Sequence, residues 1–124
     1  MLCIDTSSLI AYLEGSRGHD VDLVNQAFSD KVGVISPVTV TEVLSDPRLS
    51  RFVRETILLL PVLPIIEGYW QRAGLLRAKI LRSGHKAKLA DTLIAQNCLD
   101  HGATLVTRDD DLKVFKQMAG LRVL

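Results

Sequence analysis

Short apolar runs alternate with segments of helical character along this chain, and no other feature of the sequence constrains the fold as strongly. The uninterrupted run Leu2–Ile4 is typical of a buried parallel strand, and further strands are expected at Val32–Ile35 and Thr104–Val106. We expect Pro61–Ile65 to be a short strand at a sheet edge, because proline is poorly tolerated in central strands. A final strand is expected at Leu121–Val123.

Seven segments between these runs carry helix signals. Ser36 and Pro37 are a capping serine and a proline suited to the first helical position, and we expect their helix to stop before Pro47. The other expected helices are a segment between Thr6 and Gly15, Asp20–Phe28, Leu49–Leu59, Glu67–Arg82, Lys88–Asp100 and Asp110–Met118. Strands that alternate with helices indicate an α/β fold, with a parallel sheet and helices on both of its faces.

Four acidic residues lie close to the ends of these expected elements. Asp5 directly follows the first strand, and Asp109 lies just beyond another. Glu42 belongs to the second turn of the helix that begins with proline, and Asp91 lies near the start of a later helix. In open α/β sheets the ligand crevice lies beyond the carboxyl ends of the strands. Carboxylates beside an apolar core are costly unless they are paired or bind a cation, so the set predicts an oxygen-rich site for a hard divalent ion such as Mg²⁺.

Each of the four acids also has a purely structural interpretation. Asp5 could cap the first helix, and Glu42 could complete a capping box. Asp91 could favour the positive end of a helix dipole, and Asp109 could start the last helix, as could the two aspartates that follow it. For each residue singly the structural interpretation is favoured, but it does not explain why all four fall at compatible positions.

Length and composition narrow the class of protein. The chain has 124 residues, 48% of them hydrophobic, which suits one domain over residues 1–124 and excludes a disordered chain. Fifteen basic residues nearly balance fourteen acidic ones, so the net charge of +1 does not indicate a nucleic-acid-binding protein. Cys3 and Cys98 are too few for a disulfide scaffold or a CxxC zinc site. No pattern of a signal peptide or membrane span is found, so we expect a soluble cytoplasmic domain.

Four segments carry the acids, and together they resemble a known family: Ile4–Ile10, Ser36–Leu44, Leu89–Ala95 and Leu105–Asp109. They resemble the PIN domain, a small metal-dependent ribonuclease fold, over nearly the whole chain. The resemblance implies a single three-layer PIN-like α/β domain, in which a central parallel sheet is flanked by helices. It also implies that Asp5, Glu42, Asp91 and Asp109 are the metal ligands and catalytic residues. Ser7 departs from the family, because many relatives carry Asn there.

The size of the chain further resembles VapC-type toxins of prokaryotic toxin–antitoxin pairs. This resemblance implies a homodimer and a cognate VapB-type antitoxin that blocks the active site. We expect metal-assisted hydrolysis of RNA phosphodiester bonds, with Mg²⁺ or Mn²⁺ held by the four carboxylates. Residues expected to orient carboxylates or water beside the ligands are Thr6, Thr107 and Asp111.

Basic side chains close to the acids are candidates for holding RNA phosphates: Arg82, His85, Lys86, Lys88 and Arg108. The first four surround a glycine-containing break ahead of Asp91, where a solvated loop is an equally good interpretation. Arg108 could instead pair with a neighbouring acid.

Two other classes of function remain open from the sequence. One is a Mg²⁺-dependent phosphatase or phosphotransfer domain, which also places an aspartate after its first strand. Phosphatases of the haloacid-dehalogenase type use a second aspartate two residues later, where this chain has Ser7. The other is an interaction module that keeps the PIN fold without turnover. The four intact acids argue against it.

Overall fold

Three short parallel strands form the centre of the computed structural model, which describes residues 1–124. They are β1 (Leu2–Ile4), β2 (Gly33–Val34) and β3 (Thr104–Val106), in the order β2-β1-β3. Leu2 of the central strand pairs with Gly33 on one side and with Thr104 on the other. The predicted α/β fold with a parallel sheet is confirmed, although β2 is shorter than the expected Val32–Ile35.

Two segments expected as strands form single parallel bridges instead: Pro61–Ile65 and Leu121–Val123. Ile35 pairs with Val62 in a stretch bounded by prolines, which have no N–H with which to continue a ladder. Leu105 pairs with Val123, because α7 ends at Ala119 and the few residues that follow form only one bridge with β3. The expectation of full strands at these edges was therefore wrong, although both segments extend the sheet.

Seven α-helices and one 3-10 turn join the strands. They are α1 (Thr6–Leu13), α2 (His19–Ser29), α3 (Pro37–Ser45), α4 (Arg51–Leu58), α5 (Tyr69–Arg82), α6 (Leu89–His101), η1 (Asp110–Leu112) and α7 (Lys113–Ala119). The expected helices are all present in the expected order. The last differs in kind, because its first three residues form the 3-10 turn η1. None of the helices has both the length and the apolar character needed to cross a membrane.

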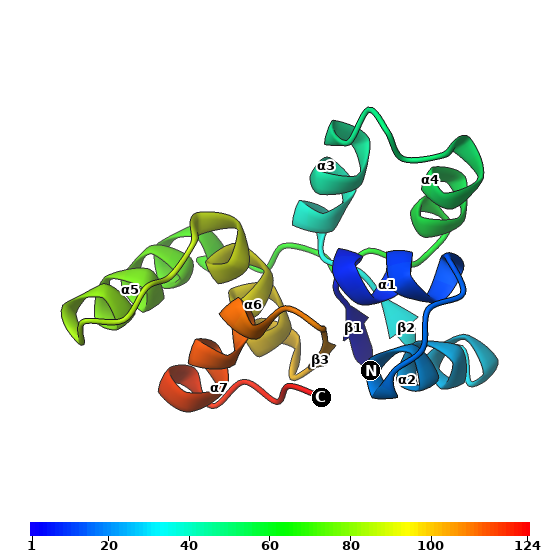
Figure 1. Ribbon diagram of the computed structural model, residues 1–124. Helices are drawn as coiled ribbons and strands as arrows, with labels where there is room; N and C mark the ends of the chain where they lie inside the picture. Colours follow the sequence, from blue (N-terminus) through cyan, green and yellow to red (C-terminus); the bar gives the residue numbers. More distant parts are fainter.

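The alternating direction of side chains along the strands separates two apolar cores. Cys3 and Leu105 pack on one side of the sheet with Phe115 and other side chains of α5, α6 and α7. Ile4 packs on the other side with Leu9 and with side chains of α2, α3 and α4. Figure 1 shows α5, α6 and α7 on one side of β1, and α1 and α2 on the other. The helices and the sheet therefore form the three layers that the sequence predicted.

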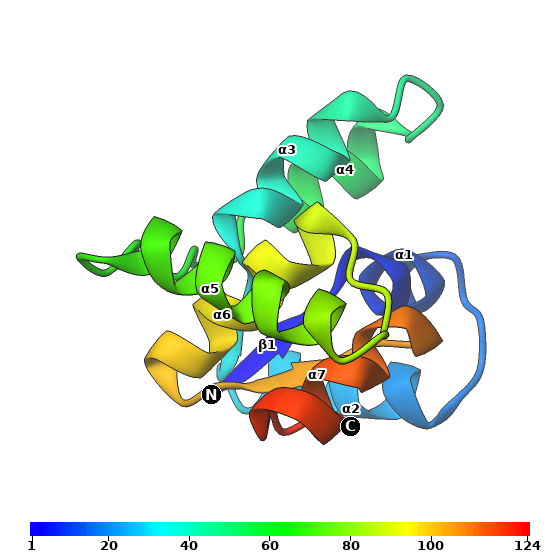
Figure 2. The same cartoon turned by 90° about the vertical axis from the view of Figure 1, so that its left-hand side faces the viewer.

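The first residues of α3 fix where this helix begins beside the sheet. Ser36 Oγ accepts a hydrogen bond from Val38 N at 3.3 Å, and Pro37 is the first helical residue, as predicted. Figures 1 and 2 show α3 and α4 as a pair that extends beyond one end of the sheet. The start of α3 is close to the strand ends, so Glu42 in its second turn stays near them.

Tyr69 connects α5 to α6, and its hydroxyl gives a test of that packing. The side chain is fully buried, and Tyr69 Oη donates to Leu93 O at 2.6 Å. We expect Tyr69→Phe to lower the free energy of unfolding by about 1 kcal/mol, because a buried donor is lost without a replacement. Denaturant unfolding measures this difference.

Tyr12→Phe is the matched control. Tyr12 Oη donates to Asn25 Oδ1 at 3.2 Å in an exposed position, so its loss should cost less than about 0.5 kcal/mol. Equal losses in the two variants would contradict a structural role for the Tyr69 hydroxyl.

Candidate metal centre

The predicted acidic residues lie at one end of the sheet. Asp5 follows β1 and takes the N-cap position of α1, but its carboxylate accepts no hydrogen bond from the amides of that helix. The capping interpretation therefore does not account for Asp5, which is only 7% exposed. Asp109 lies beyond the end of β3, Asp91 in the first turn of α6 and Glu42 within α3.

Two hydroxyl groups hold the Asp5 carboxylate in place. Ser7 Oγ donates to Asp5 Oδ2 at 2.8 Å, and Thr107 Oγ1 donates to the same oxygen at 2.9 Å. Thr107 Oγ1 also accepts a hydrogen bond from Asp109 N at 3.0 Å. A single hydroxyl thus connects the carboxylate of one expected ligand to the backbone of another. Thr6 makes no such contact, since its buried hydroxyl has no hydrogen-bond partner.

This role of Ser7 was not predicted from the sequence, where Ser7 stood out as a departure from the family pattern and from the phosphatase pattern. A hydroxyl two residues after a carboxylate on a helix start was the one signal that could have pointed to the contact, because Ser and Asp side chains often bond locally there.

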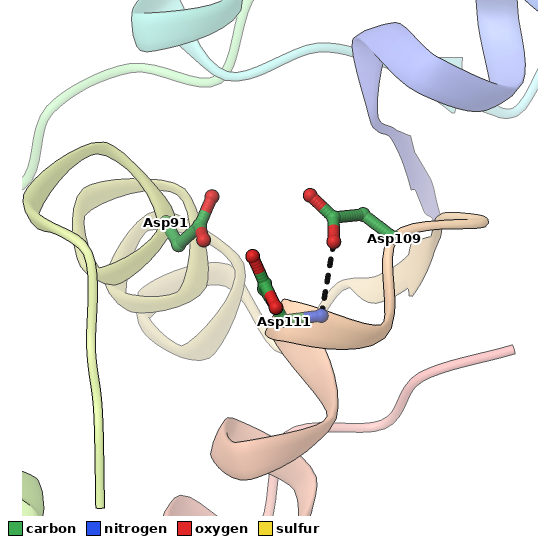
Figure 3. Close-up of side chains that lie close together, drawn as sticks. All are labelled: Asp91, Asp109 and Asp111. Carbon is green, nitrogen blue, oxygen red and sulfur yellow. Dashed lines mark hydrogen bonds between the residues drawn. The ribbon is translucent and has the colours of Figure 1, made fainter.

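Three carboxylates converge most closely at this end of the sheet. Asp91, Asp109 and Asp111 each offer an oxygen within 4.8 Å of the others, and Figure 3 shows all three side chains directed into one space. Asp111 N donates to Asp109 Oδ1 at 2.9 Å, which fixes the turn of η1 that returns Asp111 toward α6. Asp5 and Glu42 are not members of this close group.

The electrostatics nevertheless place Asp5 and Glu42 next to the same cluster. Burial raises the pKa of Asp91 to about 6, with further contributions from the negative charges of Asp109 and Asp5. The pKa of Glu42 is raised by partial burial and then by Asp5, Asp91 and Asp109, although much of its side chain is open to solvent. The four predicted acids therefore interact as one negatively charged group, with Asp111 as an additional member.

These residues fit a hard divalent cation. All the donors are carboxylate oxygens, which Mg²⁺ and Mn²⁺ prefer. Asp91 Oδ2 is buried and has no hydrogen-bond partner, a costly arrangement for a carboxylate oxygen. A bound cation would satisfy this atom and neutralise the mutual repulsion of the cluster.

The predicted basic residues are divided between two surroundings. His85, Lys86 and Lys88 line a pocket of about 410 Å³ together with Asp91 and Asp111. Arg82 does not line this pocket. Lys88 Nζ lies 2.7 Å from Asp111 Oδ2 and forms an ion pair across the pocket.

Arg108 is directed away from this pocket by a pair with Asp20 of α2. Arg108 Nε donates to Asp20 Oδ2 at 2.8 Å, and Nη2 donates to Oδ1 at 3.1 Å. These hydrogen bonds hold the pKa of Asp20 below its ordinary value. The acid that pairs with Arg108 is therefore far away in the sequence, and not the neighbouring acid that the sequence suggested.

A family comparison agrees with this fold. The family model described as the PIN domain matches residues 2–121. This chain belongs to the PIN domain family. Among curated proteins, none matches the sequence significantly.

Solved structures support the same fold for this PIN domain. VapBC-1 from nontypeable Haemophilus influenzae is similar with a TM-score of 0.74 at 21% identity, covering 99% of this chain and 96% of that one. DNA-bound VapBC from Salmonella typhimurium has a TM-score of 0.69 at 22% identity, covering 99% and 96%. VapBC-5 from Mycobacterium tuberculosis, a member of the VapBC family of toxin–antitoxin systems, has a TM-score of 0.66 at 16% identity, covering 99% and 97%.

The raised pKa of Asp91 predicts how the stability of the metal-free PIN domain depends on pH. An acid whose folded-state pKa is raised from 3.8 to about 6 contributes stability below pH ~4, and this contribution is lost as the pH rises through ~6. Asp91→Asn should therefore raise the Tm of metal-free protein at pH ~7.5, with a smaller gain at pH ~4.5. Solvent screens this partly buried carboxylate, so we expect a gain of about 4 °C, which corresponds to about 1 kcal/mol.

Thermal unfolding in chelator and in Mn²⁺ measures both effects. Mn²⁺ should raise the Tm of the unmodified protein and have little effect on Asp91→Asn, because a ligand is lost. Glu67→Gln, an exposed acid ahead of α5, is the control. It should change neither the Tm of the metal-free protein nor the rise in Tm that Mn²⁺ causes. A lower Tm for metal-free Asp91→Asn at neutral pH would rule out repulsion within the cluster.

A second prediction concerns the effect of the Thr107 hydroxyl on metal affinity. Thr107→Val keeps the shape of the side chain but removes the donor to Asp5 Oδ2, so Mn²⁺ affinity should fall about tenfold. Isothermal titration calorimetry measures the affinity. Thr104→Val is the matched control, since Thr104 lies on β3 just ahead of Thr107 and its side chain makes no hydrogen bond. Equal affinities in both variants would show that the hydroxyl does not orient the carboxylate.

Proposed function

We propose that this PIN domain is a metal-dependent endoribonuclease that hydrolyses RNA phosphodiester bonds with Mg²⁺ or Mn²⁺. The observation that carries the proposal is the convergence of Asp91, Asp109 and Asp111 within 4.8 Å, with one buried Asp91 oxygen that has no partner. The charges of Asp5 and Glu42 act on the same group. Such a site suits chemistry in which negative charge develops on a phosphate.

The residues of the chain have separable tasks in this proposal. Asp5, Glu42, Asp91 and Asp109 would hold the cation, which when bound supplies positive charge at the phosphate and activates water. Ser7 and Thr107 direct both of their hydrogen bonds to Asp5 Oδ2, which leaves Oδ1 for the cation. Asp91 has to be ionised to serve as a ligand, and its pKa is raised to about 6 in the metal-free protein, so we expect cation affinity to increase as the pH rises through this value.

The RNA would approach over the pocket beside the cluster. His85 and Lys86 line this pocket and make no ion pair, so we assign phosphate contacts to them first. Lys88 and Arg108 are engaged by Asp111 and Asp20, so a phosphate contact from either would require that pair to open.

We further propose that the protein is the toxin of a type II toxin–antitoxin pair, with a VapB-type antitoxin, and that it acts in the cytoplasm as a homodimer. The similarity in fold to chains of VapBC complexes supports the antitoxin partner. Large apolar side chains exposed on α4 and α5 support contacts with other chains: Phe52 (71%), Leu59 (84%), Trp70 (62%) and Leu75 (70%). Leu59 lies at the end of α4.

Cleavage of a mixed pool of transfer and ribosomal RNA tests the activity. We expect discrete fragments with Mg²⁺ or Mn²⁺ and none in chelator. Asp5→Asn should slow cleavage by at least about 100-fold, equivalent to about 2.7 kcal/mol of lost barrier lowering, while RNA binding remains. The control is Asp22→Asn, an exposed acid on α2 that should retain full activity.

Two outcomes would contradict the proposal. Fragments that persist in Asp5→Asn would come from a contaminating nuclease. An absence of cleavage, together with no metal-induced rise in Tm, would favour an interaction module instead of an enzyme.

A further inference from the structure

Lys88 occupies a position at which the local helix structure does not favour a positively charged side chain. It occupies the N-cap position of α6, and its side chain makes no capping hydrogen bond. The positive end of a helix dipole disfavours a lysine at this position. Its ammonium group instead reaches across the pocket to η1, where Nζ lies 2.7 Å from Asp111 Oδ2.

The contribution of this ion pair to stability is small. The side chains of Lys88 and Asp111 are 70% and 54% exposed, and exposed pairs contribute little to the free energy of unfolding. The position of the pair is more informative than its strength. Asp111 is one of the three carboxylates that converge within 4.8 Å, and Lys88 is the lysine bonded to that group.

The charge of Lys88 acts on the whole cluster. Its pKa is raised first by the hydrogen bond to Asp111 and by the charge of that residue, and further by Asp91 and Asp109. Lys88 in turn opposes the rise in the pKa of Asp91. The ammonium group therefore contributes positive charge beside the same oxygens that could hold a divalent ion.

We propose that Lys88 takes the place of a second divalent ion, so that this centre holds one ion and Asp111 serves as the partner of Lys88. In two-ion sites, ions about 4 Å apart share carboxylates and together neutralise the reacting phosphate. Here an ammonium group attached to the chain lies beside Asp111 and supplies part of that charge. The inference rests on the proposed metal-dependent function, and it concerns the number of ions that the site accepts.

Titration calorimetry with Mn²⁺ alone tests this inference without using activity. The unmodified protein should bind one ion per chain at millimolar Mn²⁺. Lys88→Met keeps the apolar stem but removes the charge, and it should bind two ions, with the Kd of the second lowered at least about tenfold. Lys88→Arg keeps the charge and should bind one. Adding Asp111→Asn to Lys88→Met should return the protein to one ion.

Lys113→Met is the matched control. Lys113 Nζ pairs with Asp110 Oδ1 at 2.7 Å, so this variant also removes a lysine from an exposed pair in the same turn. Asp110 is not one of the three converging carboxylates, and the variant should bind one ion. Because Lys88 is exposed, circular dichroism should show an unchanged fold in its variants.

Four results would overturn the inference. Two ions bound to the unmodified protein, or one ion bound to Lys88→Met with unchanged affinity, would do so while leaving the proposed nuclease intact. A second ion in Lys113→Met would show a general effect of net charge. No ion bound to the unmodified protein would overturn both this inference and the proposed metal-dependent function.

Discussion

The hydrogen-bonded pairing of β1 with β3 determines where the acidic centre forms. Asp5 N donates to Val106 O at 2.9 Å, which continues the ladder past the last residue of β1. The pairing brings the Thr107 hydroxyl to Asp5 across 102 positions in the sequence. Because that hydroxyl also accepts from Asp109 N, the same pairing positions the turn that carries Asp109 and Asp111. The register of two three-residue strands thus brings together acidic side chains from both ends of the chain.

The centre is electrostatically unfavourable in the metal-free protein, and the surrounding fold keeps it in place. Asp91 has a buried oxygen without a partner and a pKa raised to about 6, which are costs that the apolar packing of α6 must offset. The hydroxyls of Ser7 and Thr107 stabilise Asp5 without adding positive charge. Within the cluster itself, Lys88 supplies positive charge at Asp111. The clustered negative charge therefore opposes stability at this end of the sheet, as is common in sites arranged to bind a charged ligand.

The sequence was sufficient for the fold class and for most elements, because their signals are local. The run Leu2–Ile4 and the pair Ser36–Pro37 predict a buried strand and a helix start without any knowledge of the rest of the chain. The edge segments were predicted as strands and form single bridges, since pairing depends on how far a neighbouring segment runs alongside. Apolar periodicity does not contain that information.

The acidic centre was predictable in part for the same reason. Strand ends and helix starts indicated where the four acids would gather, whereas the contacts among them depend on tertiary structure. The pair between Arg108 and Asp20 spans 88 positions, and no local pattern relates the two residues. Asp111 joins the closest group because η1 is a 3-10 turn, whose tighter winding changes the direction of a side chain relative to an α-helix.

The two hydroxyls on Asp5 also have a consequence for ion selectivity. Ser7 and Thr107 both donate to Oδ2, so this carboxylate is prepared to coordinate a cation through one oxygen only. Ca²⁺ is larger and often takes both oxygens of a carboxylate, with six to eight ligands in total. Mg²⁺ requires a compact octahedral shell and accepts single oxygens. In the proposed metal site, a serine and a threonine that do not coordinate the ion would in this way discriminate between cations by size.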